Sequence, residues 1–446
     1  MNNPFKAYDI RGIYPQEINE QFALQLGKAI GTYIKGKKIV VARDGRQSGD
    51  KLYPALIKGI LTTGTNVVTI GKVSTPQFYY ALYSGTADGG VMITASHNPK
   101  AYNGFKICRA NAEPVFKENG LQKIEKIMRK QHYSEEKKQG EIIERIINQD
   151  YVKSMKKLAK TLTKKFTILA DTGNGMGILE VKALKKIYGE KLTVKVMFPE
   201  IDGNFPNHEC NPTVKENLEK IVKEIKKRRV SFGIAFDGDA DRVVFITSDG
   251  LIIPSDIITG IIGSEFVKKG EKAGYEVRSS RTVNELFEKK GIIGQLYPSG
   301  HAYIKERMKK DRARFAGEKS GHYFYQNLHY TDSSLYTIIN MLEILDRKKI
   351  SLKKIAQPIV EKYANSGELN YEVNDTDVAI RVVKNEFSSL AEKMLEIDGV
   401  SIYTKNYFFN IRKSNTEPLV RVNIEGNNKD IVKELQERIE RLISRA

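Results

Sequence analysis

The chain has 446 residues, of which 40% are hydrophobic and 28% charged, and its formal net charge is +19. A chain of this length is too long for a single core and predicts three or four domains. Its best candidate for a membrane span, residues 251–267, contains Pro254, Asp256 and Glu265, which excludes a transmembrane helix and predicts no membrane partner.

The basic charge suggests nucleic acid as a first class of partner. Along residues 215–229, however, lysines alternate with glutamates, while Leu218, Ile221, Val222 and Ile225 keep the spacing of a helix face. The charges there belong to the solvated face of a core-packed helix, so we expect no nucleic-acid partner. The two cysteines are far apart in the sequence, so we expect no disulfide. The first residues lack the basic segment followed by an apolar run that a secretory signal has, and we therefore predict a cytoplasmic protein.

Short apolar runs alternate with helix-spaced stretches through most of the chain. The first part predicts strands over residues 38–42, 66–70 and 90–93 and helices over residues 53–63 and 76–83. The pattern restarts with a strand over residues 166–170 and a helix over residues 179–188, and a third time from residue 255. Repeated units of this kind predict an α/β fold with largely parallel sheets flanked by helices.

The last part of the chain has a different pattern. The polar stretch 364–370 indicates a loop at a domain boundary, and the lysine-rich stretch 122–147 contains the first boundary. Beyond the polar loop we expect a small α+β domain, with antiparallel strands over residues 399–403, 408–412 and 419–425 and a helix over residues 430–444. The predicted domains are therefore residues 1–145, 146–250, 251–365 and 366–446.

A serine follows one of the predicted strands closely. The apolar run 90–93 is stopped by residues 94–99 (TASHNP), which have the composition of a tight loop. Open α/β sheets bind ligands at the carboxyl ends of their strands, so Ser96 would lie at such a site. On position alone an ordinary turn serine is the favoured interpretation, and the functional one depends on two further loops.

The second loop is acidic. Residues 237–242 (DGDADR) lie between two apolar runs, and their alternate spacing lets Asp237, Asp239 and Asp241 converge on one hard cation. An EF-hand is excluded because the glycine and glutamate that it needs at positions 6 and 12 are absent. A charged turn is the alternative, but three unpaired carboxylates beside buried strands would repel one another. We therefore predict a metal site, with Mg²⁺ as its natural occupant.

Three other segments carry weaker signals. Residues 412–418 (RKSNTEP) crowd two cations, two hydroxyls and an amide into a short loop, as a phosphate-binding loop needs. Residues 317–322 (GEKSGH) offer a carboxylate and a hydroxyl suited to adjacent sugar hydroxyls, although each of these loops alone is more often a plain turn. The glycine-rich segment 171–177 lacks the third glycine of a dinucleotide fingerprint, and no Walker motif occurs.

Five motifs occur in the order seen in the α-D-phosphohexomutases: residues 8–12 (YDIRG), 94–99, 237–242, 317–322 and 412–418. The chain resembles this family, in its phosphomannomutase/phosphoglucomutase branch, over essentially its whole length. The resemblance implies three similar α/β domains with mixed, largely parallel sheets. It also implies a small C-terminal α+β domain similar to the TATA-box-binding fold, and an arrangement of all four around a central cleft.

The same resemblance implies a role for each motif residue. The metal ligands would be Asp237, Asp239, Asp241 and a phosphate oxygen on Ser96, the family's phosphoserine. The groups implied in catalysis beside Ser96 are Arg11, His97, Lys106 and His301, of which Lys106 and His301 are the proton-transfer candidates. The substrate-binding groups would be Tyr8, Arg242, Glu318, Ser320, Arg412, Ser414, Asn415 and Thr416. A lysine base needs a lowered pKa, and crowding of Lys106 by Arg11, Arg242 and the metal is the expected cause.

The implied activity is an intramolecular phosphotransferase that interconverts the 1- and 6-phosphates of mannose or glucose. It would use Mg²⁺, a phosphoserine, and a hexose 1,6-bisphosphate as intermediate and activator. The nearest alternative is a phosphoglucosamine or N-acetylglucosamine phosphomutase of the same family, whose last loop typically resembles Arg-Pro-Ser-Gly-Thr. Lys413 and Asn415 favour the mannose/glucose branch. A nucleic-acid-binding protein on a degenerate mutase fold is a distant alternative, and the sequence leaves the preferred sugar and the oligomeric state open.

Overall fold

A computed structural model of the chain describes residues 3–134, 136–414 and 419–444. The chain forms two compact units. Unit 1 comprises Met1–Ile253 and Ser320–Lys353, and unit 2 comprises Pro254–Lys319 and Lys354–Ala446. In the described part of the chain, no helix has the length and the apolar composition that crossing a membrane requires.

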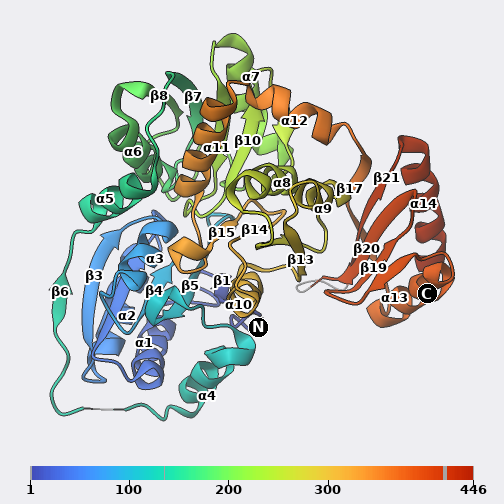
Figure 1. The fold of residues 1–446 in the computed structure, drawn as a ribbon. Helices are drawn as coiled ribbons and strands as arrows, with labels where there is room; N and C mark the ends of the chain where they lie inside the picture. Colours follow the sequence, from blue (N-terminus) through green and yellow to red (C-terminus); the bar gives the residue numbers. More distant parts are fainter. Residues whose placement is uncertain (1–2, 135, 415–418, 445–446) are drawn as a thin grey trace. The chain divides into compact units, whose positions relative to one another are not determined.

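The first sheet of unit 1 has six strands in the order β1-β5-β4-β2-β3-β6 (Figure 1). Their bounds are β1 Ile10–Ile13, β2 Lys38–Arg43, β3 Asn66–Lys72, β4 Gly89–Ile93, β5 Tyr102–Arg109 and β6 Ile142–Glu144. Strand β2 pairs in parallel with β3 and β4, and β3 with β6, whereas β5 pairs antiparallel with β1 and β4. The helices that follow or connect them are α1 Glu20–Ile34, α2 Gly49–Leu61, α3 Thr75–Tyr83 and α4 Gln122–Lys130, with short helices Ala110–Ala112 and Lys117–Leu121.

This sheet has a hydrophobic core on each face. Ile39 and Val41 of β2 pack into a cluster with residues of α1 and α2. Val40 and Ala42, which alternate with them along the strand, pack into a second cluster with residues of α3. A strand that buries both faces is a continuous apolar run, as the sequence pattern indicated. Helix α2 begins at Gly49, before the predicted start at residue 53, so that Pro54 lies inside it.

The second sheet of unit 1 has the order β11-β10-β9-β7-β8. Its strands are β7 Phe166–Asp171, β8 Leu192–Met197, β9 Phe232–Phe236, β10 Val243–Thr247 and β11 Ile252–Ile253. Strand β7 pairs in parallel with β8 and β9, whereas β9, β10 and β11 are antiparallel. The remaining helices of this part are α5 Asn148–Leu158, α6 Gly177–Tyr188, the short helix Gly189–Lys191 and α7 Lys215–Lys227. Unit 1 also contains β15 Tyr323–Tyr325, the short helix Gln326–Leu328, β16 Thr331–Asp332 and α11 Ser334–Lys348.

Unit 2 begins with a parallel arrangement in which β12 Lys272–Glu276 pairs with both β13 Ile293–Tyr297 and β14 Phe315–Gly317. The helices here are α8 Ser255–Phe266, α9 Arg281–Glu288 and α10 His301–Asp311, and α12 Leu352–Val360 precedes the C-terminal part. These elements continue the βα pattern that the sequence predicted from residue 255.

The C-terminal part of unit 2 is an antiparallel sheet in the order β17-β21-β20-β19-β18 with two helices. Its elements are β17 Ala364–Glu372, α13 Thr376–Ser388, β18 Lys393–Leu395, β19 Val400–Tyr403, β20 Tyr407–Lys413, β21 Leu419–Gly426 and α14 Lys429–Ile443. The expected loop over residues 364–370 is wrong. This stretch is the edge strand β17, and its polar composition reflects a mostly exposed strand with a bulge between Asn365 and Glu368.

Candidate active site

Ser96 lies in a tight turn just after the fully buried strand β4. Its φ is 50°, a left-handed conformation that is uncommon for residues with a side chain, and its backbone N–H donates to Thr94 Oγ1 at 2.9 Å. The Ser96 hydroxyl is buried and donates to Asp237 Oδ2 at 2.7 Å. The turn therefore holds the hydroxyl against the acidic loop between β9 and β10.

The acidic loop brings its three carboxylates together. One oxygen from each of Asp237, Asp239 and Asp241 lies within 4.8 Å of the other two, and all three side chains are buried. Among the described residues, neither Asp239 Oδ1 nor Asp241 Oδ1 has a hydrogen-bond partner. Buried carboxylate oxygens left over in this way fit a hard divalent cation, which prefers oxygen ligands. Gly238 permits the close approach, because a Cβ there would meet the backbone oxygen of Ser96 at 2.6 Å.

Lys106, on β5, is the cation nearest to these carboxylates. Its ammonium lies 2.9 Å from Asp239 Oδ2 and also contacts Asp241. Burial disfavours the charged form, but the two carboxylates outweigh burial and raise the pKa of Lys106. The expected lowering of this pKa depended on Arg11, Arg242 and a bound metal together, and it stays a prediction for the metal-bound site.

The pKa values of the three aspartates shift in different directions. Burial, with the negative charges of Asp241 and Asp239, raises the pKa of Asp237 well above its ordinary value. For Asp239 and Asp241 burial also acts upward, but the ammonium of Lys106 contributes strongly in the other direction and their pKa values are lowered. The loop thus holds carboxylates in different electrostatic environments within one small space.

Arg11 and His97 flank the serine. Arg11, on β1, donates to Asp9 Oδ2 at 2.9 Å and to the backbone oxygen of Ala95 at 3.1 Å, so it braces the serine turn. His97 Nδ1 lies 3.3 Å from Ser96 Oγ. Burial, and then the charges of Arg242 and Arg11, lower the pKa of His97 well below its ordinary value, which makes its imidazole neutral at neutral pH.

Arg242 is held by a chain of buried groups that the sequence did not reveal. Its Nε donates to His322 Nε2 at 2.9 Å, and His322 Nδ1 lies 2.8 Å from Asp332 Oδ2. Since Nε2 accepts from Arg242, the ring proton is on Nδ1, which lies beside the Asp332 carboxylate. Asp241, His322 and Asp332 could also be grouped as metal ligands, but both ring nitrogens already have these partners. His322 stands in the 317–322 motif, whereas Asp332 had no sequence signal.

Glu318 and His301 lie in unit 2. Glu318 follows β14 and is buried, and its Oε1 accepts a hydrogen bond from the backbone N–H of Gly300 at 3.0 Å. Gly300 precedes α10, whose first residue is the buried His301. The structure therefore brings the Glu318 and His301 segments together. Two residues after Glu318, the half-buried Ser320 belongs to unit 1.

Arg412 belongs to a cluster of three arginines around one carboxylate. Glu368 on β17 accepts from Arg278 at 3.0 Å, from Arg412 at 3.1 Å and from Arg421 at 3.3 Å. Burial would raise the pKa of Glu368, but the three guanidinium groups outweigh it and the pKa is lowered. Arg278 also pairs with Glu276, and the positive charge that remains in the cluster suits a phosphate. Sequence reasoning missed Arg278, Glu368 and Arg421, which are far from residues 412–418 along the chain.

The predicted site residues fall into two groups. Unit 1 contains Tyr8, Arg11, Ser96, His97, Lys106, Asp237, Asp239, Asp241, Arg242 and Ser320. Unit 2 contains His301, Glu318, Arg412 and Ser414. Tyr8 and Ser414 are both half-buried. Asn415 and Thr416 lie outside the described residues.

Sequence profiles of the four phosphoglucomutase/phosphomannomutase domains match this chain in order. The three α/β/α domains match residues 2–135, 149–250 and 254–363, and the C-terminal domain matches residues 368–442. The chain therefore belongs to the phosphoglucomutase/phosphomannomutase family. The predicted α/β architecture with mixed, partly parallel sheets and a C-terminal α+β domain is confirmed, and the chain is an isomerase of the hexose phosphate mutase class.

Similar proteins and a similar crystal structure agree with this family assignment. The chain is 37% identical to a phosphomannomutase of Methanocaldococcus jannaschii, over 99% of this chain and 97% of that one. It is 32% identical to a phosphomannomutase of Escherichia coli, over 95% and 94% of the two chains. The crystal structure of a phosphoglucomutase/phosphomannomutase family protein from Burkholderia thailandensis superposes with a TM-score of 0.89 at 29% identity, covering 98% of this chain and 96% of that one. Members of this family are metal-dependent, and the acidic cluster of unit 1 could hold the metal.

Proposed function

We propose that this mutase interconverts the 1- and 6-phosphates of mannose and glucose through a phosphate carried on Ser96. The observation that carries the proposal is the buried Ser96 hydroxyl, 2.7 Å from Asp237, at a loop where three carboxylates converge. The acidic loop beside this hydroxyl could hold a metal, and the turn at Ser96 fixes the direction of the hydroxyl. We also propose domain limits at residues 1–145, 146–250, 251–365 and 366–446, which the matched ranges support.

The proposed metal is Mg²⁺. Asp237, Asp239 and Asp241 would hold it together with an oxygen of the Ser96 phosphate, and their donor set consists of oxygen atoms alone, as Mg²⁺ prefers. A divalent cation at this position would supply positive charge to the transferring phosphoryl group.

In the first half of the reaction, a hexose 1-phosphate presents its free 6-hydroxyl to phosphorylated Ser96. The bond from phosphorus to Ser96 Oγ breaks, a bond from phosphorus to the sugar O6 forms, and the hydroxyl proton passes to a base. Lys106 and His301 are the proposed proton-transfer groups. Lys106 must first lose its pairing with Asp239 and Asp241, because that pairing keeps its ammonium protonated.

In the second half, the hexose 1,6-bisphosphate turns so that its 1-phosphate meets the bare serine. The bond from phosphorus to the sugar O1 then breaks, a bond from phosphorus to Ser96 Oγ forms, and the serine proton passes through the proton-transfer group to the sugar O1. The same bisphosphate, added from outside, would rephosphorylate an enzyme that has lost its phosphate, which is why we propose it as activator. Arg11, His97 and Arg242 would neutralise or orient the transferring group.

The remaining motif residues would hold the sugar and the phosphate that is not being transferred. We propose Glu318 and Ser320 as contacts of the sugar hydroxyls and Tyr8 as a further substrate contact. Arg412 and Ser414, with Asn415 and Thr416, would hold the second phosphate. The arginine cluster around Glu368 supports this role for Arg412, because its positive charge exceeds what Glu368 and Glu276 together neutralise.

An amino-sugar phosphate is the second candidate substrate, and the mannose/glucose reading is favoured by Lys413 and Asn415. We expect no nucleic-acid partner. The two cysteines, Cys108 and Cys210, are buried free thiols, which suits the proposed cytoplasmic location.

The test combines a labelled phosphate with a serine variant. Incubation with hexose 1,6-bisphosphate labelled in both phosphates should leave label on the peptide that contains Ser96. Ser96→Ala should lose that label and at least roughly a thousandfold of kcat, while its melting temperature stays within a few degrees of the wild type. Ser84→Ala, which changes an exposed serine, is the matched control. Wild-type turnover by Ser96→Ala would remove the serine from the carrier role, and a panel of mannose, glucose and amino-sugar phosphates would rank the substrates.

A further inference from the structure

The edge strand β6 exposes an unusual amount of apolar surface. Ile142, Ile143 and Ile146 are 54%, 38% and 86% exposed, and they are three of the seven large hydrophobic side chains exposed in the described residues. Edge strands are commonly protected from pairing by lysines, prolines or bulges. Although the chain has 73 lysines and arginines, residues 139–147 contain no lysine and no proline.

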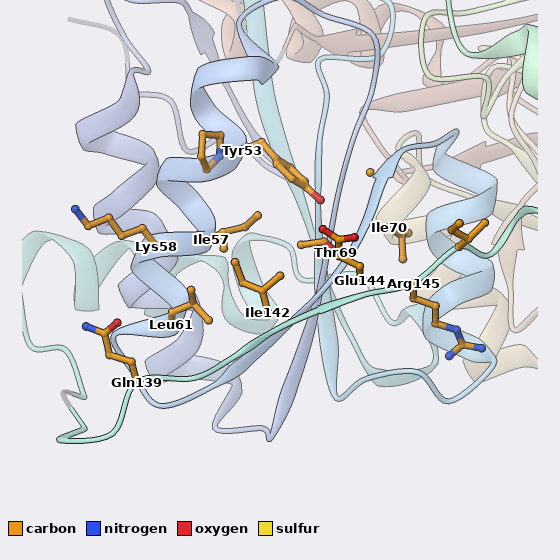
Figure 2. A pocket seen from close by; sticks show the side chains of 13 residues that line it. Tyr53, Ile57, Lys58, Leu61, Thr69, Ile70, Gln139, Ile142, Glu144 and Arg145 are labelled. Carbon is orange, nitrogen blue, oxygen red and sulfur yellow. The ribbon is translucent and has the colours of Figure 1, made fainter.

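A groove of about 630 Å³ runs along this strand. It lies between α2 and the β3–β6 pair, and its apolar lining includes Ile57, Leu61, Ile70 and Ile142 (Figure 2). Figure 2 shows Ile142 on the side of the strand that faces α2, close to Leu61. Ile142 and Ile146 both line the groove, so its apolar surface reaches β6, whereas Ile143 lies on the opposite face of the strand.

The outer edge of β6 has free backbone groups. Glu141 accepts from Val67 N–H and Arg145 donates to the Thr69 oxygen, both at 2.9 Å, so the odd-numbered residues bond to β3. Because successive residues of a strand alternate in direction, the N–H and C=O groups of Ile142 and Glu144 point away from β3. A strand that approaches this edge can pair with them.

We propose that a second copy of this chain binds here, with the two β6 strands antiparallel about a twofold axis through Ile143. Three alignments of the two strands, with the twofold axis at residue 142, 143 or 144, let the outward N–H and C=O groups of one copy bond to those of the other. Only the central one places opposite charges across the interface, because Glu141 of each copy faces Arg145 of the other. In this register Ile143 of one copy lies opposite Ile143 of the other. Ile142 of each copy lies opposite Glu144 of the other, and these two residues exchange backbone hydrogen bonds.

The other two registers are less favourable. Centring on residue 144 sets Glu144 against Glu144, and centring on residue 142 leaves Glu141 opposite Ile143. In the central register, Ile146 of one copy lies opposite Gly140 of the other, beyond the ends of β6, where the Gly140 N–H already donates to the Leu61 oxygen at 2.9 Å. The most exposed isoleucine of the patch thus meets the one position that lacks a side chain. A self-complementary edge of this kind fits a twofold dimer.

The test is the mass of the full-length protein in solution, measured by light scattering and sedimentation from about 1 to 100 µM. The wild type should form a dimer. Ile143→Lys sets two lysines face to face and should raise the dimer dissociation constant roughly tenfold or more. Ile146→Asp, at a mostly exposed position where folding is not at risk, should weaken the dimer in the same direction. Ile293→Lys, which changes an exposed isoleucine of β13, is the matched control and should leave the mass unchanged.

A charge swap tests the register itself. Glu141→Arg and Arg145→Glu should each weaken the dimer, because each places like charges opposite one another, and the double variant should restore it to within about threefold of the wild type. The amides of Ile142 and Glu144 should exchange with deuterium more slowly as the protein concentration rises. A wild type that is monomeric at every concentration would overturn the proposal. So would a dimer that resists Ile143→Lys, or one that Ile293→Lys dissociates. Mutase activity of the variants should be unchanged, since none of these residues belongs to the site.

Discussion

Glu180, on α6, is a fully buried carboxyl whose described hydrogen-bond partners are two hydroxyls. Ser74 Oγ donates to Oε1, and Tyr151 Oη donates to Oε2 at 2.9 Å. Burial raises the pKa of Glu180 from its ordinary value of 4.5 to about 7, and the two hydrogen bonds only partly oppose the shift. The fold therefore penalises the ionised form of this side chain.

The sign of the effect on stability follows from linkage. Between pH 4.5 and pH 7 the folded chain binds this proton more tightly than the unfolded chain, so Glu180 contributes most below pH 4.5 and its contribution is lost as the pH rises to about 7. A shift of 2.5 units between these two values corresponds to about 3 kcal/mol. Glu180→Gln keeps the size of the side chain and removes its titration. Relative to the wild type, the variant should therefore gain about 3 kcal/mol between pH 4.5 and pH 8.

The assay is thermal unfolding of the wild type and the variant at several pH values from 4.5 to 8.5. For a unit the size of unit 1, the predicted change corresponds to a melting-temperature difference that grows by roughly 5 °C over this range. Glu190→Gln, at an exposed position, should follow the wild type at every pH. A difference between wild type and Glu180→Gln that is the same at all pH values would refute the reasoning. Ser74 adjoins Thr75, whose hydroxyl donates to Asp239 at 2.6 Å, so the segment that contacts Glu180 also contacts the acidic loop.

Three further changes test the groups around the two proposed phosphate sites. Asp332→Asn should lower kcat roughly tenfold or more with little change in KM, because Arg242 loses the carboxylate that fixes its histidine partner, and steady-state kinetics will show the split. Asp239→Asn should lower both metal affinity and kcat, measured by activity against added Mg²⁺ after chelation, and activity independent of the metal would contradict the site. Glu368→Gln should destabilise unit 2 by about 2 kcal/mol, since Arg278, Arg412 and Arg421 lose the carboxylate that they share, and unchanged unfolding would show that the carboxylate is not needed.

The part of the site that could be predicted consists of residues whose neighbours in sequence are also their neighbours in space. Ser96 follows a short apolar run closely, and the three aspartates alternate within one loop between two such runs. A buried strand followed by a polar loop fixes which end of its own sheet those side chains reach. Ser96 follows β4 of the first sheet and the acidic loop follows β9 of the second, so their meeting was expected only from the family resemblance. The structure brings Ser96 and Asp237 within hydrogen-bond distance.

What could not be predicted depends on pairing between distant segments. Lys106 contacts two aspartates more than a hundred residues away, and this contact raises its pKa. Asp332 reaches Arg242 only through His322. The stretch 364–370 looked like a loop because its polar residues are exposed, yet its backbone pairs with β21. Glu368 in that stretch contacts three arginines from different strands or loops, and no local sequence pattern predicts these contacts.

The charges around Ser96 suggest why a metal and a phosphate would occupy this site together. Lys106 pairs with Asp239 and Asp241, and Arg242 lies 3.7 Å from Asp237. Arg11 is paired with Asp9, so the negative and positive side chains nearly cancel. A serine phosphate adds nearly two negative charges at neutral pH, and a divalent cation adds two positive ones. Adding either one alone would leave an uncompensated charge in a buried place, which is costly, whereas adding both restores the balance. The same balance returns after each transfer only if the serine regains a phosphate. A serine phosphate and a divalent cation would therefore stabilise each other in this part of unit 1.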